Sequence, residues 1–139
     1  MRLTLFTDYA IRVLLFLAAE PERLVTVGEI AKKYDVSQHH LVKVVQDLVK
    51  NGYVKSTKGR GGGMRLAVLP NDINVGQIVK QFEPEMQMID CSDCPLCGNC
   101  SLPRPMNEAV NAFLAVLNKY SLKDIIEKSP NMSKTIIGI

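Results

Sequence analysis

The sequence of 139 residues predicts a mainly α-helical fold, a winged helix-turn-helix with a two-stranded wing, followed by a long C-terminal helix. Three observations predict it: two short helical segments joined by a brief turn, two strand-like runs around a glycine-rich stretch, and a long apolar stripe after two prolines. Apolar residues make up 47% of the chain, enough for a packed core, and charged residues 22%, too few for wholesale disorder. We expect one ordinary domain, or a small domain with a long appended element, and this size excludes a multi-domain enzyme.

The first two helices are predicted by apolar spacing and by a capping motif. Apolar residues recur every three or four positions over residues 4–19, which indicates the first helix. Thr26 and Glu29 have capping-box spacing, in which each residue satisfies an exposed amide of the first helical turn. A second, short helix should therefore begin there and reach Tyr34.

The third helix and the wing follow directly. Ser37 is a good N-cap for a helix that Asn51 and Gly52 should close. Residues 53–56 and 64–68 are short, partly alternating runs, and the glycines between them predict a hairpin with a flexible tip. One face of the third helix carries the apolar residues Leu41, Val44, Val45 and Leu48.

The C-terminal half should contain three more helices and a loop. A fourth helix is expected to start near Asn74 and to bury Val75, Ile78, Val79 and Phe82 before Pro84. Residues 90–101 lack periodicity and should form a loop. A long helix can begin about Pro105 and run to Tyr120, because proline is tolerated in a first turn, and a short helix should follow from Ser121. The apolar stripe of the long helix consists of Met106, Ala109, Val110, Phe113, Leu117 and Tyr120.

We divide the chain into a DNA-binding domain (1–70), a connecting helix (71–89), a cysteine loop (90–102) and a long helix with a C-terminal tail (103–139). The first 70 residues hold 11 Lys/Arg against 6 Asp/Glu, and the remainder hold 6 against 8, so the front half suits a polyanion. The longest apolar run is far shorter than the ~20 residues that cross a bilayer, and the N-terminus lacks a secretory pattern. We therefore expect a cytoplasmic protein with no membrane partner.

The exposed face of the third helix is a candidate for reading a DNA duplex. Its polar side chains can donate to or accept from base edges in the major groove, and the positive end of the helix suits a phosphate. An ordinary solvated polar face is the alternative, but the capped helix before it and the wing after it favour DNA. The candidate DNA-binding residues of this helix are Ser37, Gln38, His39, His40 and Lys43.

The glycine-rich tip of the hairpin is the second candidate DNA contact. It fits neither of the glycine motifs that bind nucleotides. With Lys58, Arg60 and Arg65, a mobile tip can lie against phosphates or enter a minor groove, where arginine is favoured electrostatically. The alternative is a flexible hairpin with scattered charge.

All four cysteines lie within ten residues, as Cys91, Cys94, Cys97 and Cys100. Two-residue spacers let consecutive thiolates converge on one small inorganic centre, so a metal site is expected. Zinc normally uses two separated ligand pairs, and no second pair is present, so an iron–sulfur cluster, either 4Fe–4S or 2Fe–2S, is favoured over zinc. A pair of disulfides is the remaining alternative.

With these residues assembled, the chain resembles the Rrf2 family of winged-helix transcription regulators, and within it the nitric-oxide-sensitive repressor branch. The match covers nearly the full length, and the ordered set of motifs carries it rather than any single one. The motifs are Leu5–Arg12, Val36–Ser37, Leu41–Val44, Gly52–Val54, Gly62–Leu66 and Asn118–Asp124.

The resemblance implies a homodimer crossed by the long helix, which is then a dimerisation helix, and a cluster held by three loop cysteines per subunit. The family spacing selects Cys91, Cys94 and Cys100, and leaves Cys97 without a counterpart. It also implies a further ligand from the partner's first helix at the position of Asp8, oriented by Arg12. Cys97 could take that fourth position instead, and Asp8 could simply complement the helix dipole.

The resulting hypothesis is a regulator, most simply a repressor, that binds a pseudo-palindromic operator and senses nitric oxide through its cluster. A sensor of iron or cluster supply is the runner-up, and a zinc-stabilised DNA-binding protein or an electron carrier are alternatives of another class. An enzyme is not expected, because no catalytic set of Ser, His and Asp stands at a recognisable spacing.

Overall fold

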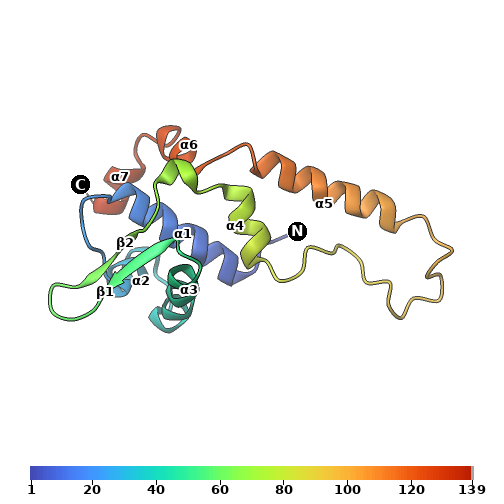
Figure 1. Cartoon of the computed structure of the whole chain (residues 1–139), viewed down its shortest axis with the longest axis horizontal. Coiled ribbons are helices and arrows are strands. Elements are labelled where there is room, and N and C mark those ends of the chain that lie inside the picture. The colour runs from blue at the N-terminus through green and yellow to red at the C-terminus, as the bar shows by residue number, and fades with distance from the viewer. Residues whose placement is uncertain (139) are drawn as a thin grey trace.

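The computed structural model describes residues 1–138, and in this range the chain forms a helical body with one two-stranded antiparallel sheet at its edge (Figure 1). The mainly helical winged fold predicted from the sequence is confirmed. In chain order the elements are α1 (Leu5–Ala19), α2 (Val27–Tyr34), α3 (Gln38–Lys50), β1 (Val54–Thr57), β2 (Gly63–Leu66), the short 3-10 helix η1 (Pro70–Asp72), α4 (Val75–Phe82), α5 (Pro103–Leu117), α6 (Leu122–Glu127) and α7 (Met132–Ile137).

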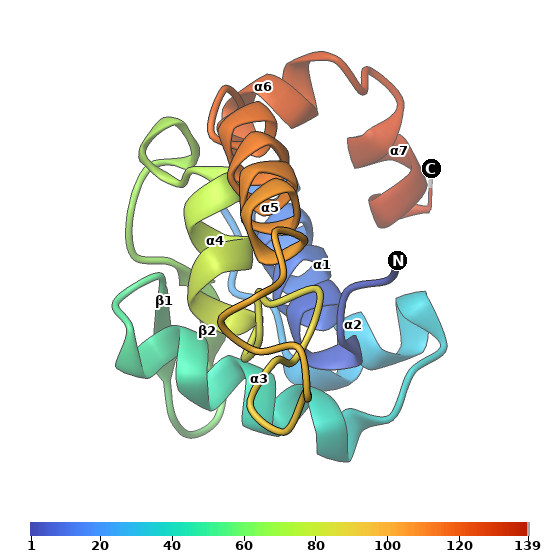
Figure 2. The same ribbon diagram turned by 90° about the vertical axis from the view of Figure 1, so that its right-hand side faces the viewer.

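Helix α1 is the central element of the fold. It contacts α3, α4, α6, α7 and β2, and Figure 2 shows these elements grouped around it. Its buried face supplies much of the core, including Val13, Leu14 and Leu17. Leu122 of α6 and Ile136 of α7 join the same core, so the C-terminal tail folds back onto the N-terminal helices. Among the described residues, no helix has the length and hydropathy required to cross a bilayer.

The first helix of the helix-turn-helix, α2, is capped as the sequence predicts. The Glu29 backbone N–H donates to the Thr26 hydroxyl at 3.2 Å, and the Thr26 N–H donates to the Glu29 carboxylate at 2.8 Å. This backbone hydrogen bond, with help from Arg23, lowers the pKa of Glu29. Asp35 ends α2 in the left-handed conformation with φ of 52°, and α3 starts three residues later with its predicted apolar face buried.

Strand β2 of the wing is hydrogen-bonded on both of its edges, to β1 and to Val25. Strands β1 and β2 pair with Val54 opposite Leu66 and with Lys55 opposite Arg65, within one or two residues of the predicted limits. Met64 also exchanges two backbone hydrogen bonds of 2.8 and 2.9 Å with Val25, which ties the hairpin to the segment before α2. The base of the wing is therefore fixed, and its glycine-rich tip projects away from the core.

Helix α5 begins and ends earlier than expected, at Pro103 and Leu117 instead of Pro105 and Tyr120. Pro103 occupies the first turn, where no backbone donor is needed. At the other end, the Tyr120 carbonyl accepts from the Val75 N–H at 2.9 Å, which draws the chain out of the helix and towards α4. The short helix expected from Ser121 is confirmed as α6, and Ser121 and Asp124 form a capping box at its start, whereas α7 was not predicted.

Candidate nucleic-acid interface and cysteine loop

The N-terminal half of α3 presents a polar, solvent-exposed surface. Ser37, Gln38, His39, His40 and Lys43 are all exposed, while Leu41 and its apolar neighbours pack against the core. Ser37 occupies the N-cap position but, within the described chain, its side chain makes no capping hydrogen bond. Its hydroxyl and the first amides of α3 are therefore available to an external acceptor, and a DNA phosphate is such a group.

The wing adds four exposed basic side chains, at Lys55, Lys58, Arg60 and Arg65. Lys55 and Arg65 stand directly opposite each other in the sheet, and two like charges at such a position destabilise a hairpin. A bound polyanion would offset the repulsion between these two cations, so the surface is suited to such a partner. Sequence reasoning missed Lys55, because only the strand register shows that it faces Arg65.

The tip of the wing depends on glycine at two positions. Gly59 and Gly61 have φ of 94° and 73°, in the left-handed region that other residues rarely adopt. The Gly62 N–H closes the turn by donating to the Gly59 carbonyl at 3.0 Å. This turn displays Lys58 and Arg60 at the end of the molecule that lies opposite the cysteine loop (Figure 1).

Arg60→Ala should weaken binding to a cognate duplex about threefold to tenfold and reduce the slope of log affinity against log salt by about 1, because one phosphate contact is lost. Lys134→Ala serves as the control, because it removes the positive charge of an exposed side chain on α7. A fluorescence anisotropy titration at several salt concentrations measures both effects. An Arg60 variant that matches the control at every salt concentration would remove the wing tip from the interface.

The cysteine loop is built from consecutive tight turns. The Cys94 N–H donates to the Cys91 carbonyl at 3.3 Å, and the Cys97 N–H donates to the Cys94 carbonyl at 3.0 Å. The first two of the three two-residue spacers thus reverse the chain before the next thiol. Gly98, with φ of 84°, bends the chain again before Cys100, whose sulfur accepts from the Leu102 N–H at 3.5 Å.

The four thiols are free, with Cys91 and Cys94 half-buried and Cys97 and Cys100 exposed. Loss of hydration raises the pKa of Cys91, and the neighbouring thiols raise it further, led by Cys94. Among the described residues, no three metal-ligating side chains already converge on one point. The donor set itself fits an iron–sulfur centre or zinc, since it consists of soft sulfur ligands on a short loop that turns at every spacer.

Asp8 and Arg12 form an ion pair on α1. Arg12 Nε donates to Asp8 Oδ1 at 2.9 Å, a second guanidinium nitrogen lies 2.9 Å from Oδ2, and the two side chains are 41% and 36% exposed. The hydrogen bond to Asp8 raises the pKa of Arg12. Burial raises the pKa of Tyr34, whose hydroxyl donates to the Arg12 carbonyl at 3.2 Å.

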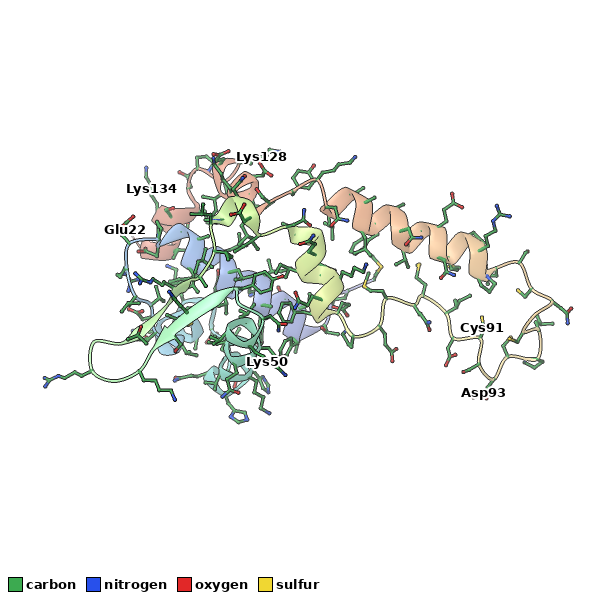
Figure 3. All side chains as sticks on the ribbon, in the orientation of Figure 1. Glu22, Lys50, Cys91, Asp93, Lys128 and Lys134 are labelled. Carbon is green, nitrogen blue, oxygen red and sulfur yellow. The ribbon has the colours of Figure 1, made fainter. Side chains whose placement is uncertain are left out.

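One chain does not bring Asp8 and the thiols together. Asp8 lies on α1 within the helical body, whereas Cys91 lies far out on the loop between α4 and α5 (Figure 3). A ligand set that includes both therefore needs a second subunit.

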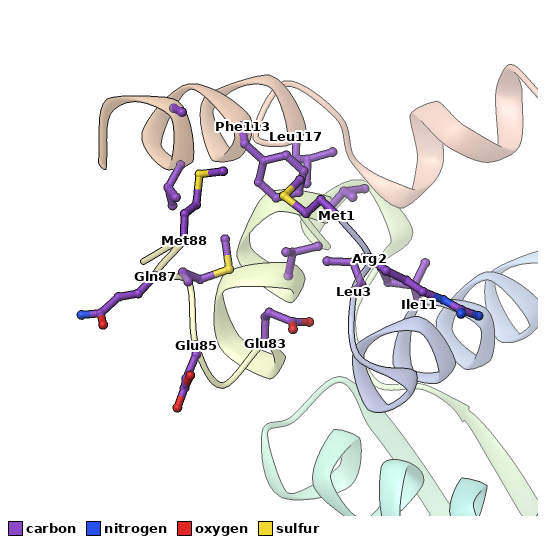
Figure 4. A pocket seen from close by; sticks show the side chains of 15 residues that line it. Met1, Arg2, Leu3, Ile11, Glu83, Glu85, Gln87, Met88, Phe113 and Leu117 are labelled. Carbon is purple, nitrogen blue, oxygen red and sulfur yellow. The ribbon is translucent and has the colours of Figure 1, made fainter. Parts of the chain in front are cut away.

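The apolar stripe of α5 has no buried residue within the chain. Together with α1, α4 and residues 83–88 it borders a groove of about 620 Å³, lined by Met1, Ile11, Met88 and Phe113 among others (Figure 4). Apolar surface of this kind is typical of a protein interface.

Comparisons with known proteins agree with this architecture. Residues 3–128 match the Rrf2 family, described as "Iron-dependent Transcriptional regulator". The chain is 42% identical to the HTH-type transcriptional regulator NsrR of Bacillus subtilis, over 98% of this chain and 97% of that protein. It is 39% identical to NsrR of Bacillus licheniformis, over 98% of this chain and 99% of that protein.

Two solved structures share the fold. CymR, the global cysteine regulator of B. subtilis, superposes with a TM-score of 0.76 at 24% identity, over 92% of this chain and 98% of its own. IscR of T. potens superposes with a TM-score of 0.72 at 26% identity, over 93% of this chain and 88% of its own. The curated relatives are transcriptional regulators and not enzymes. The chain belongs to the Rrf2 family of iron-dependent transcriptional regulators.

Proposed function

We propose that this chain is a homodimeric repressor whose cysteine loop holds an iron–sulfur cluster and which senses nitric oxide through it. The observation that carries the proposal is a loop of four free thiols at two-residue spacing, in which two hydrogen-bonded turns join the first three. The same chain has an exposed polar face on α3 and a basic wing. The likeness to the NsrR regulators, and the resemblance of residues 5–12 to the nitric-oxide-sensitive branch, support this choice of signal.

Cys91, Cys94 and Cys100 would hold the cluster, and Asp8 of the partner subunit would complete the ligand set. A bound cluster supplies iron atoms that react with nitric oxide. A carboxylate is a hard ligand beside three soft thiolates, so Asp8 is the easiest of the four to displace. Arg12 orients the Asp8 carboxylate through the two contacts of 2.9 Å seen in the chain.

The dimer would form through the apolar face of α5. No residue of this face is fully buried in one chain, and Met106, Val110, Phe113 and Leu117 are half-buried. The face borders the groove with α1 and α4, so a second copy can cover its exposed part. Two copies related by a twofold axis would place two α3 helices in successive major grooves of a pseudo-palindromic operator. A hundredfold change in operator affinity needs ~2.7 kcal/mol of differential binding between the two states.

Protein purified without oxygen, together with a duplex selected by it from a random pool, tests the proposal. We expect iron and sulfide in the protein, a visible absorption spectrum, and roughly a hundredfold loss of affinity for the selected duplex after stoichiometric nitric oxide. A variant with serine at all four cysteine positions is the control, and its affinity should not respond to nitric oxide.

Three outcomes would contradict the proposal. Zinc alone would make the loop a structural zinc site. Affinity that follows loss of the cluster but ignores nitric oxide would indicate a sensor of iron or cluster supply. If the DNA affinity changes neither with nitric oxide nor with loss of the cluster, the protein binds DNA independently of the centre in its cysteine loop, which then has a redox or other role.

A further inference from the structure

Tyr34 connects the Asp8–Arg12 ion pair to the helix-turn-helix. The Arg12 guanidinium lies 5.6 Å from the centre of the Tyr34 ring, in the range of a cation–π contact, and the Tyr34 hydroxyl donates to the Arg12 carbonyl at 3.2 Å. The ring also packs edge-on against Phe16, one turn further along the same face of α1, with 6.2 Å between the ring centres. One side chain of α2 therefore contacts α1 in three different ways.

Tyr34 also lies next to the start of the recognition helix, α3. It is the last residue of α2, and the left-handed Asp35 that follows is held by hydrogen bonds to the carbonyls of Ala31 and Lys32. Helix α3 begins at Gln38, one of the candidate base-reading residues. A displacement of Tyr34 would be passed through this short, fixed turn to the first residues of α3.

Tyr34 lies beside open space. Tyr34 borders a groove of about 490 Å³ that it shares with Leu15 and residues 129–136. The guanidinium of Arg12 is thus shared between the Asp8 carboxylate on one side and a ring beside an open groove on the other. Without the Asp8 carboxylate, Arg12 retains its contacts with the Tyr34 side chain.

We infer that Tyr34 is a positioning residue that relays the state of the Asp8–Arg12 pair to the recognition helix. The inference rests on the proposed function, in which the engagement of Asp8 changes between the two states of the regulator. Tyr34 touches neither the iron ligands nor the DNA in this account. It acts through Arg12 on one side and through the Asp35 turn on the other.

A double-mutant cycle in cluster-free protein tests this relay without any metal. Asp8→Asn removes the negative charge of the ion pair. Operator affinity is measured with and without this substitution in three proteins, which carry Tyr34, Tyr34→Leu or Tyr34→Phe. We expect Asp8→Asn to change affinity at least fivefold with Tyr34 present and less than twofold with Tyr34→Leu. Tyr34→Phe keeps the ring over Arg12 and should restore most of the fivefold response.

Tyr120→Leu is the matched control, because Tyr120 lies beyond Leu117, where α5 and its proposed dimer face end. The change removes a cation–π contact of similar geometry, with Lys128 at 4.9 Å, that has no link to Asp8. The Asp8→Asn response should persist in this background. Equal responses in all four backgrounds, or no response to Asp8→Asn in any, would overturn the relay. Failure of the proposed function appears separately, as cluster-loaded protein whose affinity ignores nitric oxide.

Discussion

Replacing Cys100 by serine should leave the protein with little bound iron and sulfide, whereas replacing Cys97 should leave both near their full amounts. Serine offers a hard hydroxyl that stays protonated at neutral pH, so it cannot substitute for a thiolate on iron. Cys100 belongs to the set that the family spacing selects, and Cys97 does not. Chemical analysis of iron and acid-labile sulfide in protein isolated without oxygen measures the difference.

The Cys97 variant is a close control, since both residues are exposed thiols of the same loop, three positions apart. Loss of iron in both variants would mean that the loop supplies all four ligands and that Asp8 is not one of them. Retention of iron in both would show that the loop is not the cluster site. Circular dichroism should be unchanged in either variant, because the loop contains no helix or strand.

Gly76→Ala should lower the free energy of unfolding by about 1–3 kcal/mol, the usual cost of forcing an extra carbon into a packed site. A Cβ on Gly76 would lie 2.8 Å from the backbone nitrogen of Asn118, closer than real Cβ atoms come to any neighbour. The Asn118 backbone cannot swing away, because its carbonyl accepts from the Asn74 side chain at 2.7 Å. The midpoint of urea unfolding, at equal protein concentrations, measures the effect.

Gly28→Ala is the corresponding control in α2. A Cβ there would meet the Gln38 side-chain oxygen at 3.7 Å and the Thr26 hydroxyl at 3.9 Å, both ordinary contacts. Alanine also has the higher helix propensity, so this variant should be as stable as the parent or slightly more so. Equal midpoints for the Gly76 and Gly28 variants would show that α4 and α5 are not held tightly at this junction.

Much of the fold could be predicted from the sequence because local signals coincide with its boundaries. The Thr26–Glu29 and Ser121–Asp124 capping boxes both form with their reciprocal hydrogen bonds. Left-handed glycines occur where the hairpin tip was expected. Such features depend on residues three or four positions apart, and those distances are visible in a sequence.

Features that depend on distant residues could not be predicted. The end of α5 at Leu117 follows from hydrogen bonds across to α4, and α7 is held by its packing on α1. Val75, expected in the core, is half-buried, while its neighbour Gly76 is buried against Asn118. The spacing of the thiols indicated a metal centre, but their convergence does not follow from spacing. The contribution of Asp8 that we propose involves a second subunit, and the sequence of one chain does not show how two subunits meet.

The wing and the cysteine loop lie at opposite ends of the molecule (Figure 1). If the wing lies on DNA as we propose, a promoter-bound regulator would still leave its thiol segment accessible to dissolved gases and small reductants. A small molecule would then act on the regulator while it is bound to the promoter, without a wait for its spontaneous release. Regulator molecules bound to the promoter and those free in solution would therefore respond to the same concentration of the small molecule at the same time.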